Sequence, residues 1–330
     1  MKCFVRNYKT STDYPKIFNS YFEGLKSCVF DIETTGLDSS RCKVILVAFL
    51  VKTDSGISIT QFLAENHFEE NKVLEASLNF IEREKINYFI TFNGAGFDLP
   101  FFNKRLEHNY TDKQINNYNF DLYRFLTRNT DLKLKIGSMR QKSLEEHYGI
   151  SSSRQDIISS RESIVLFDKY SLTGNSTLEK ILLTHNREDV LQLYKLLCLS
   201  IREISDMDSA MAGYGFPIMD GLYTVRPALL RKKSVLRING DQNQNPVSAA
   251  FFPDGENEIT SIFNARTGLF EVSVPVSKYQ DHFFLDIQSM GIDISSDPDY
   301  INGYLILNSR TINRLSSILV EKIVNEKKLI

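Results

Sequence analysis

The stretch Val44-Ile-Leu-Val-Ala-Phe-Leu-Val51 is apolar at every position and rich in β-branched residues. Such a run is typical of a central strand that is covered on both faces of a sheet. Lys26 to Glu33 has the pattern of another strand, and Ile57 to Ala64 follows the Asp54-Ser55-Gly56 turn as a hairpin partner. The sequence therefore predicts a three-stranded meander around this run.

The segments that follow alternate between helix and strand. Glu69 to Glu84 carries apolar residues at helical spacing, and Tyr88 to Phe92 has the pattern of a strand that stops at Asn93-Gly-Ala-Gly96. Leu178 to about Ile201 is strongly helical. This order predicts an α/β domain over residues 26–204, with a mixed sheet flanked by helices, behind an N-terminal extension of residues 1–25.

The distribution of proline indicates a boundary near residue 205. Only Pro15 and Pro100 precede it, and the other six prolines follow it. Short β-rich runs separated by Gly, Pro, Asn and Asp fill residues 205–330, and an amphipathic helix over about Arg310 to Lys327 closes the chain. We expect a smaller β-rich C-terminal domain with a C-terminal helix and no assignable role.

Composition excludes several classes of protein. The 330 residues are 42% hydrophobic and 24% charged, as in an ordinary globular protein, and the net charge of −2 provides no bulk positive field for coating nucleic acid. The longest apolar stretch is far shorter than the roughly 20 residues of a membrane span. Four scattered cysteines favour neither a disulfide framework nor a zinc site, so we expect a cytoplasmic protein without a membrane segment.

Two acidic features lie at the ends of predicted strands. Asp31 and Glu33 are two positions apart, so both carboxylates project from the same face of their strand. Either the strand ends there in a solvated turn, or the two acids share a divalent cation such as Mg²⁺ or Mn²⁺. Asp98 follows the Asn93 to Gly96 turn at the start of a helix, where capping alone would explain it.

A third feature lies on the predicted helix of residues 178–201. His185 and Asp189 occupy the centre of its apolar face, between Leu182 and Leu193. A charged side chain in a core-facing stripe is costly unless it is paired or binds a metal. A structural His–Asp pair is one interpretation, but four carboxylates in three separate elements favour a metal site.

Three segments together resemble a known group of enzymes. DIETTG at 31–36, FNGAGFDLPFF at 92–102 and HNREDVLQL at 185–193 are similar to the three exonuclease motifs of the DEDD 3′–5′ exonuclease superfamily, and most similar to its YprB-type ribonuclease H-like family. The resemblance covers about residues 26–203. It implies a ribonuclease H-like fold in which four acids bind two Mg²⁺ or Mn²⁺ ions, namely Asp31, Glu33, Asp98 and Asp189.

The resemblance also implies roles for neighbouring residues. His185 is the expected general base, although it lies four residues before Asp189, where the superfamily normally has Tyr, and a catalytic His usually lies five residues before. Asp121 matches an Asp of the YprB-type family, but a helix cap explains it equally well. The expected substrate contacts are Thr34, Asn93, Phe97, Asp121 and Arg124. Asn93 and Phe97 could instead be turn and packing residues.

These observations predict an enzyme. We expect a metal-dependent nuclease, a 3′–5′ exonuclease acting on single-stranded DNA or RNA, with one ion activating water and the other stabilising the leaving oxygen. The alternatives are a catalytically silent nucleic-acid-binding module and a protein-interaction scaffold on the same fold. The four acids argue against a silent module, because buried carboxylates without a bound metal are costly to a fold. Two basic runs are candidates for substrate binding, although a solvated charged face is the commoner meaning of either. The first is favoured because it follows the candidate strand of Asp121, and it comprises Arg124, Arg128, Lys133, Lys135, Arg140 and Lys142. The second comprises Arg226, Arg231, Lys232, Lys233 and Arg237.

Overall fold

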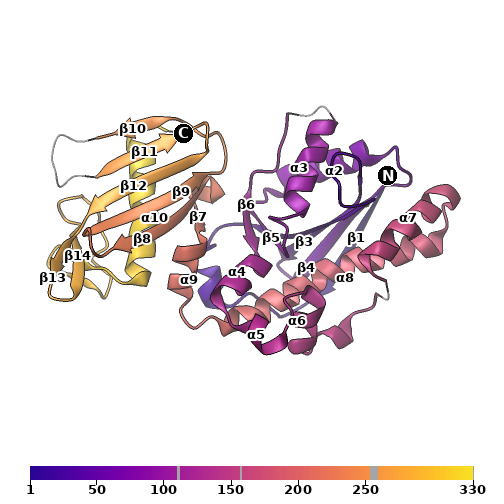
Figure 1. Cartoon of the computed structure of the whole chain (residues 1–330), viewed down its shortest axis with the longest axis horizontal. Helices are drawn as coiled ribbons and strands as arrows, with labels where there is room; N and C mark the ends of the chain where they lie inside the picture. The colour runs from indigo at the N-terminus through magenta and orange to yellow at the C-terminus, as the bar shows by residue number, and fades with distance from the viewer. Residues whose placement is uncertain (110–111, 157, 253–258, 330) are drawn as a thin grey trace. The chain divides into compact units, whose positions relative to one another are not determined.

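The computed structural model describes residues 1–109, 112–156, 158–252 and 259–329. The chain divides into two compact units, Met1–Ser205 and Asp206–Ile330, which we call unit 1 and unit 2. Figure 1 gives the order of the elements along the chain. Within the described residues, no helix is both long enough and apolar enough to pass through a membrane.

Unit 1 is an α/β unit. In chain order its elements are β1 (Lys2–Lys9), α1 (Lys16–Asn19), β2 (Ser27–Thr34), β3 (Val44–Thr53), β4 (Gly56–Leu63), α2 (Glu70–Glu84), β5 (Tyr88–Thr91), α3 (Asp98–His108), β6 (Tyr118–Asp121), α4 (Leu122–Asn129), α5 (Leu132–Ile136), α6 (Gln141–His147), the 3₁₀ turn η1 (Ser151–Ser153), α7 (Ser160–Thr173), α8 (Ser176–Ser200) and η2 (Ile201–Glu203).

The sheet of unit 1 is mixed and has the strand order β1-β4-β3-β2-β5-β6. Strands β2, β5 and β6 run parallel, whereas β1, β4, β3 and β2 form an antiparallel meander. All residues from Val44 to Val51 are buried, as expected of a central strand covered on both faces. The predicted α/β fold with a mixed sheet flanked by helices is confirmed.

The first 25 residues belong to unit 1 and are not a separate extension, because residues 2–9 form the sheet strand β1. Each residue of β1 pairs with β4, from Lys2 opposite Leu63 to Lys9 opposite Gly56. Phe18 is fully buried and packs edge-on against Phe120 of β6. The sequence did not indicate β1, because it is an edge strand with mostly exposed polar side chains and lacks a continuous apolar face.

The two faces of β2 carry different side chains. Phe30 contacts the rings of Phe49 and Phe102 on the face that α2 and α3 cover. Asp31 and Glu33 project from the opposite face, where Asn186 of α8 bonds to Asp31 and Ser163 of α7 bonds to Glu33. The alternation along the strand therefore delivers both carboxylates to one side of the sheet, and a register shift between Glu33 and Thr34 ends the regular pairing there.

A tight turn connects β5 to α3. Asn93 adopts a φ of 62°, and a Cβ on Gly94 would lie 2.4 Å from the Cβ of Thr91. Only glycine fits where the backbone comes so close to a neighbouring side chain. The two glycines of the Asn93 to Gly96 segment thus serve a sharp turn that brings Asp98 to the start of α3.

Unit 2 is β-rich. Its elements are α9 (Met207–Tyr214), β7 (Phe216–Ile218), η3 (Met219–Gly221), β8 (Tyr223–Leu230), β9 (Val235–Gln242), β10 (Ala249–Phe251), β11 (Thr260–Asn264), β12 (Leu269–Pro275), β13 (Ser277–Tyr279), β14 (His282–Asp286), β15 (Tyr300–Ile301), β16 (Tyr304–Ile306) and α10 (Ser309–Glu326). One sheet has the order β10-β11-β12-β9-β8-β7 and another the order β13-β14-β16-β15. Helix α10 packs against β8 and α9. The predicted β-rich region with a C-terminal helix is confirmed.

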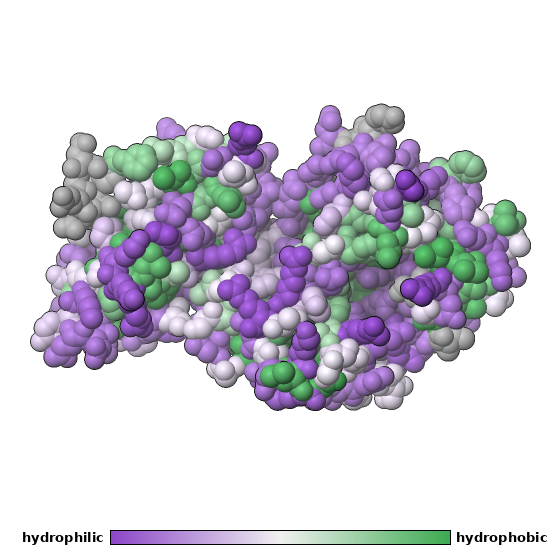
Figure 2. Space-filling view, in the orientation of Figure 1, coloured by the Kyte–Doolittle hydropathy of each residue, from purple (hydrophilic) through white to green (hydrophobic). Residues whose placement is uncertain are grey.

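Hydropathy on the visible face of the molecule is mixed. Figure 2 shows hydrophilic residues over most of that face, with hydrophobic residues gathered in small separate groups. Scattered apolar residues of this kind are normal on a protein surface.

Candidate active site

Three elements of unit 1 bring acidic side chains together. Strand β2 contributes Asp31 and Glu33, the start of α3 contributes Asp98, and the middle of α8 contributes His185 and Asp189. One ligand atom each from Glu33, His185 and Asp189 lie within 4.8 Å of one another. The charges of the other three acids act on Asp31. The four acids that the sequence singled out are therefore close neighbours in space.

Two of these acids are held by donors from their surroundings. The Ser163 hydroxyl of α7 donates a hydrogen bond of 2.7 Å to Glu33 Oε2. The backbone N–H of Ile32 donates to Asp98 Oδ1 at 3.3 Å. Glu33 and Asp98 are 6% and 8% exposed, so their carboxylates have little access to bulk water.

Asp31 is held through a chain of amides. Asn186 Nδ2 donates to Asp31 Oδ2 at 2.8 Å. The Asn186 amide is in turn oriented by Gln61 of β4, whose Nε2 donates to Asn186 Oδ1 at 2.9 Å. Because Gln61 occupies the amide oxygen, the NH₂ group of Asn186 faces the carboxylate. A neighbour of His185 on α8 thus fixes the acid on β2.

Burial is the main reason why the carboxyl pKa values in this cluster are high. It raises the pKa of Glu33 and of Asp98 to about 7 and the pKa of Asp31 well above its usual range. The neighbouring carboxylates raise the pKa of Asp31 further. The ionised forms of these three carboxyls are therefore disfavoured in this structure, and a bound cation would stabilise them.

His185 lies between the acids and a further carboxylate, Asp156. Its Nδ1 is 2.6 Å from Asp156 Oδ2, and its Nε2 is 3.5 Å from Glu33 Oε1 and 3.7 Å from Asp189 Oδ2. Burial lowers the pKa of His185, but the bond to Asp156 and the charges of Asp189 and Glu33 outweigh burial and raise it. The imidazole is therefore cationic more readily than a free histidine.

Arg154 is the cation that pairs directly with carboxylates at the site. Its guanidinium pairs with Asp189 and Asp156, and with Glu145 at 2.9 Å. These bonds and charges outweigh burial and raise the pKa of Arg154, while Arg154 and His185 hold the pKa of Asp156 well below its usual range despite burial. Asp156 is therefore ionised and accepts the Nδ1–H of His185, which leaves Nε2 without a hydrogen in the neutral ring.

The donor set fits a divalent cation. Carboxylate oxygens are the ligands that Mg²⁺ and Mn²⁺ prefer. The Nε2 atom of His185 is buried and forms no hydrogen bond with the described residues, although it faces Glu33 and Asp189. An unsatisfied buried ring nitrogen beside two acids is consistent with a place for an ion or water. The four acids are the residues that would hold the metal.

A cavity of about 620 Å³ opens beside two of the acids, Asp31 and Asp189, and His185. Its lining comprises Asp31, Arg140, Gln141, Lys142, Arg154, Ser159, Arg161, His185 and Asp189. Both acids and cations line this cavity. Its acids could bind a divalent cation, and its cations could bind an anionic ligand beside it.

The five residues expected to contact substrate do not line this cavity. Thr34 Oγ1 donates to the carbonyl of Gly36 at 2.7 Å, and the Phe97 ring packs on Phe101 with centroids 5.3 Å apart. The side chain of Asn93 is exposed at the turn before α3. The side chains of Thr34 and Phe97 therefore have partners in the turn and in α3, and both have a structural role.

Asp121 and Arg124 belong to a supporting structure. The Asp121 carboxylate is fully buried and accepts the N–H groups of Asn93 at 2.9 Å and Ala95 at 3.1 Å. It also caps α4 through the N–H of Arg124, whose Nε lies 3.6 Å from Asp121 Oδ2. Asp121 therefore holds the turn that places Asp98, which is a structural role.

Sequence reasoning missed several residues around the site. Arg154 and Asp156 lie in a Ser- and Arg-containing segment that has no helical or strand periodicity, so no pattern could place them beside α8. Ser163 faces Glu33 from α7, a helix that was not among the predicted elements. Asn186 had a detectable signal, because it directly follows His185 within the motif at residues 185–193.

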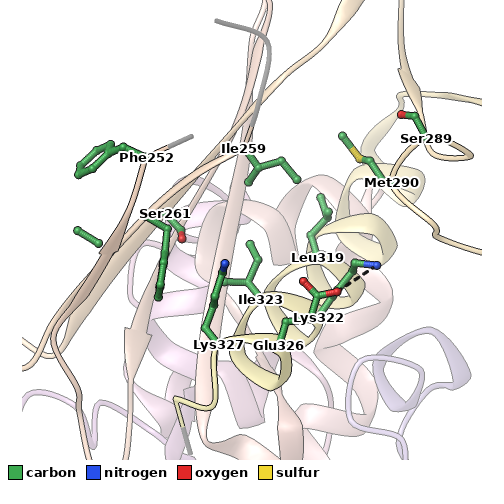
Figure 3. A pocket seen from close by; sticks show the side chains of 12 residues that line it. Phe252, Ile259, Ser261, Ser289, Met290, Leu319, Lys322, Ile323, Glu326 and Lys327 are labelled. Atoms are coloured by element: carbon green, nitrogen blue, oxygen red, sulfur yellow. Dashed lines mark ion pairs between the residues drawn. The ribbon is translucent and has the colours of Figure 1, made fainter. Parts of the chain in front are cut away.

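Unit 2 contains a separate cavity of about 650 Å³ between β10, β11 and α10 (Figure 3). Phe252, Ile259, Leu319 and Ile323 provide much of its lining. Its charged groups already have partners, because Lys322 pairs with Glu326 at 3.3 Å and Lys327 lies over the Phe251 ring. The cavity in unit 1 therefore has the stronger chemical case for an active site.

Comparisons with known proteins identify the fold family. No curated protein sequence matches the chain. The structure is similar to that of the family B DNA polymerase from the hyperthermophilic archaeon Pyrobaculum calidifontis, with a TM-score of 0.41 and 15% identity. That match covers 75% of this chain and 39% of the polymerase. The family model of the RNase H superfamily matches residues 28–199, which is more than half of the chain and contains all four acids. The chain therefore belongs to the RNase H superfamily.

Proposed function

We propose that this protein is a metal-dependent nuclease of the DEDD type that hydrolyses phosphodiester bonds as a 3′–5′ exonuclease on single-stranded DNA or RNA. Within the superfamily we place it with the YprB-type enzymes, on the three motifs that contain its acids. We further propose Mg²⁺ or Mn²⁺ as the cofactor, residues 1–205 as the catalytic unit and a cytoplasmic location. Membership of the RNase H superfamily supports the reaction class.

One observation carries the proposal. Four carboxylates from β2, α3 and α8 meet in one cluster, and burial together with the neighbouring acids raises the pKa of three of them, Asp31, Glu33 and Asp98. A fold gains nothing from such a cluster unless a ligand compensates the charge, since burying unneutralised carboxylates is costly. Divalent ions bound there would supply Lewis-acid stabilisation of the charge that develops on a phosphodiester.

The protein side chains have distinct tasks in this proposal. Asp31, Glu33, Asp98 and Asp189 bind the cofactor, and Asn186, Ser163 and the Ile32 N–H orient three of them. His185 accepts a proton at Nε2, because Asp156 holds the hydrogen on Nδ1. Neutralising Glu33 and Asp189 would lower the pKa of His185 and return the ring to the form that accepts a proton.

The decisive experiment is a cleavage assay on the full chain. Protein with Mg²⁺ or Mn²⁺ is incubated with 5′-labelled single-stranded and double-stranded DNA and RNA. A ladder of products that shorten from the 3′ end supports the proposal, whereas discrete internal cuts would indicate an endonuclease. Asp31→Asn should abolish cleavage, and Asp54→Asn, an exposed acid in the β3–β4 turn, should not.

The alternatives predict different results in the same assay. A silent nucleic-acid-binding module would bind the labelled strands without cutting them. A protein-interaction scaffold would neither bind nor cut. Either outcome in both metals, with folded protein, would overturn the proposed reaction.

A further inference from the structure

Besides Arg154, three cations line the cavity that contains Asp31, His185 and Asp189. Arg140 and Lys142 lie at the start of α6, and Arg161 lies in the first turn of α7. Two separate parts of the chain therefore place positive charge beside the same cavity as Asp31, His185 and Asp189. All three cations are exposed, so their charged groups are open to a ligand.

These cations differ from Arg154, which lines the same cavity. Arg154 is buried and pairs with three carboxylates. Among the described residues, Arg140, Lys142 and Arg161 form no ion pair, and the Lys142 ammonium has a carbonyl contact, with Ile158, at 3.5 Å. Lys142 adds to the lowering of the pKa of Glu162, which Ser159 mainly causes, without pairing with that acid. Their charge is therefore available for an external anion.

The rest of the basic run is placed differently. Arg124 lies beside Asp121, and Lys135 pairs with Asp131 at 2.9 Å. Arg128 and Lys133 are exposed but are not part of the cavity lining. Only Arg140 and Lys142 of the six cations in that run line the cavity, and Arg161 joins them from another helix.

We propose that Arg140, Lys142 and Arg161 form a phosphate clamp that binds the backbone of a nucleic-acid strand next to the phosphodiester at the acids. This inference rests on the proposed function. It implies that the substrate is a strand with several phosphates and not an isolated phosphodiester. The clamp reads charge and not base sequence, because guanidinium and ammonium groups on phosphates position a strand without specifying bases.

The clamp also agrees with the net charge of the protein. A protein with a net charge of −2 cannot attract a polyanion by its overall field. Three unpaired cations beside one cavity provide a local field that acts within about 10 Å at ordinary ionic strength. Binding should therefore depend on these residues and on salt.

The test compares a clamp variant with a matched control in the full chain. The clamp variant carries Arg140→Gln, Lys142→Gln and Arg161→Gln. The control carries Lys9→Gln, Lys169→Gln and Lys180→Gln, which removes three exposed cations of unit 1 that lie outside the cavity lining and outside the basic run. Both variants lose the same charge, so a general electrostatic effect would weaken them equally.

Binding is measured first, by fluorescence anisotropy of labelled oligothymidylate and oligouridylate in EDTA across a salt series. Three lost phosphate contacts should lower the slope of log K against log salt by about 2 and the affinity by on the order of 100-fold at about 0.1 M salt. The control should bind as the wild type does. Equal slopes and affinities for the clamp variant and the control would overturn the proposal.

Cleavage then separates this inference from the proposed function. The clamp variant should lose kcat/KM on the oligonucleotides but keep the wild-type value on p-nitrophenyl thymidine 5′-phosphate, which has a single phosphodiester. A parallel loss on both substrates would contradict a clamp. If the wild type cleaves neither substrate, the proposed function fails, yet the anisotropy comparison still decides whether these residues bind a strand.

Discussion

Asp156 Oδ2 lies 2.6 Å from Nδ1 of His185, and both side chains are nearly inaccessible to solvent. The carboxylate reaches the imidazole from the segment between η1 and α7, whereas the four acids approach from β2, α3 and α8. The Asp156 carboxylate, which is not one of the four acids, therefore fixes the imidazole ring on its Nδ1 side. Its other nitrogen faces Glu33 and Asp189.

The first prediction concerns this pair. Asp156→Asn should lower kcat by roughly 100-fold or more, with a much smaller change in KM, because an amide can stabilise the wrong tautomer and cannot hold the imidazolium. His185→Gln should cost a similar factor. The two losses should not multiply in the double variant, since both act through one proton acceptor. Fully multiplicative losses in steady-state kinetics would separate Asp156 from the function of His185.

The second prediction concerns the metal. Millimolar Mg²⁺ or Mn²⁺ should raise the melting temperature of the wild type, because a ligand at 100 times its Kd adds about 2.7 kcal/mol to the free energy of unfolding. In Asp189→Asn, the metal-induced rise in melting temperature should be mostly lost, and a higher metal concentration should not restore it. Differential scanning calorimetry measures both. The same metal-induced shift in Asp189→Asn and wild type would exclude Asp189 as a ligand.

Much of the fold and of the site follows from local patterns. The continuous apolar run of β3 and the helical spacing in α2 and α8 were sufficient to predict the mixed sheet. The parity of Asp31 and Glu33 along a strand predicted that both would lie on one face, and both do. Hydrophobic periodicity predicts these elements because it shows whether one face or both faces of a strand or helix are buried.

Other features depend on contacts between distant segments, which periodicity does not encode. Strand β1 is polar and exposed, and only its pairing with β4 identifies it. Arg154 and Asp156 lie in an irregular segment and reach the site through ion pairs with residues of α6 and α8. Asp121 had the residue type of a ligand, but the turn of residues 93–95 occupies its oxygens.

The third prediction tests this role of Asp121. Asp121→Ala removes the acceptor of three backbone N–H groups, on Asn93, Ala95 and Arg124. Since an unpaired buried amide costs about 1–3 kcal/mol, partly offset by water, the free energy of unfolding should fall by about 2 to 4 kcal/mol. Asp121→Asn keeps one oxygen and should lose less. Urea denaturation measures the effect.

The control for Asp121 is Asp54→Ala, an exposed acid in the β3–β4 turn, which should change stability by no more than about 0.5 kcal/mol. A loss in Asp121→Ala no larger than in this control would contradict the structural role. Cleavage by Asp121→Asn should also fall, because the turn leads directly into Asp98. Normal cleavage by a destabilised variant would show that Asp98 does not depend on the turn.

The last prediction concerns unit 2, where Asp297 joins two arginines of α10. Its carboxylate oxygens lie 2.8 Å from the guanidinium groups of Arg310 and Arg314. Burial raises the pKa of Asp297, but the N–H of Asp299 and the two arginines outweigh burial and lower it. A carboxyl with a lowered pKa in the folded state stabilises the fold at any pH above its unfolded value of about 3.9, and this contribution is lost as the pH falls further.

Unit 2 should therefore lose stability below about pH 4, as Asp297 takes up a proton and its ion pairs with the two arginines are lost. Asp297→Asn should lower the protection of the first turns of α10 at neutral pH and flatten its dependence on pH. Exposed Asp281→Asn should leave both unchanged. Hydrogen–deuterium exchange of residues 297–314 in the full chain measures these effects, and an acid-induced loss of protection of equal size in wild type and Asp297→Asn would assign it to another group.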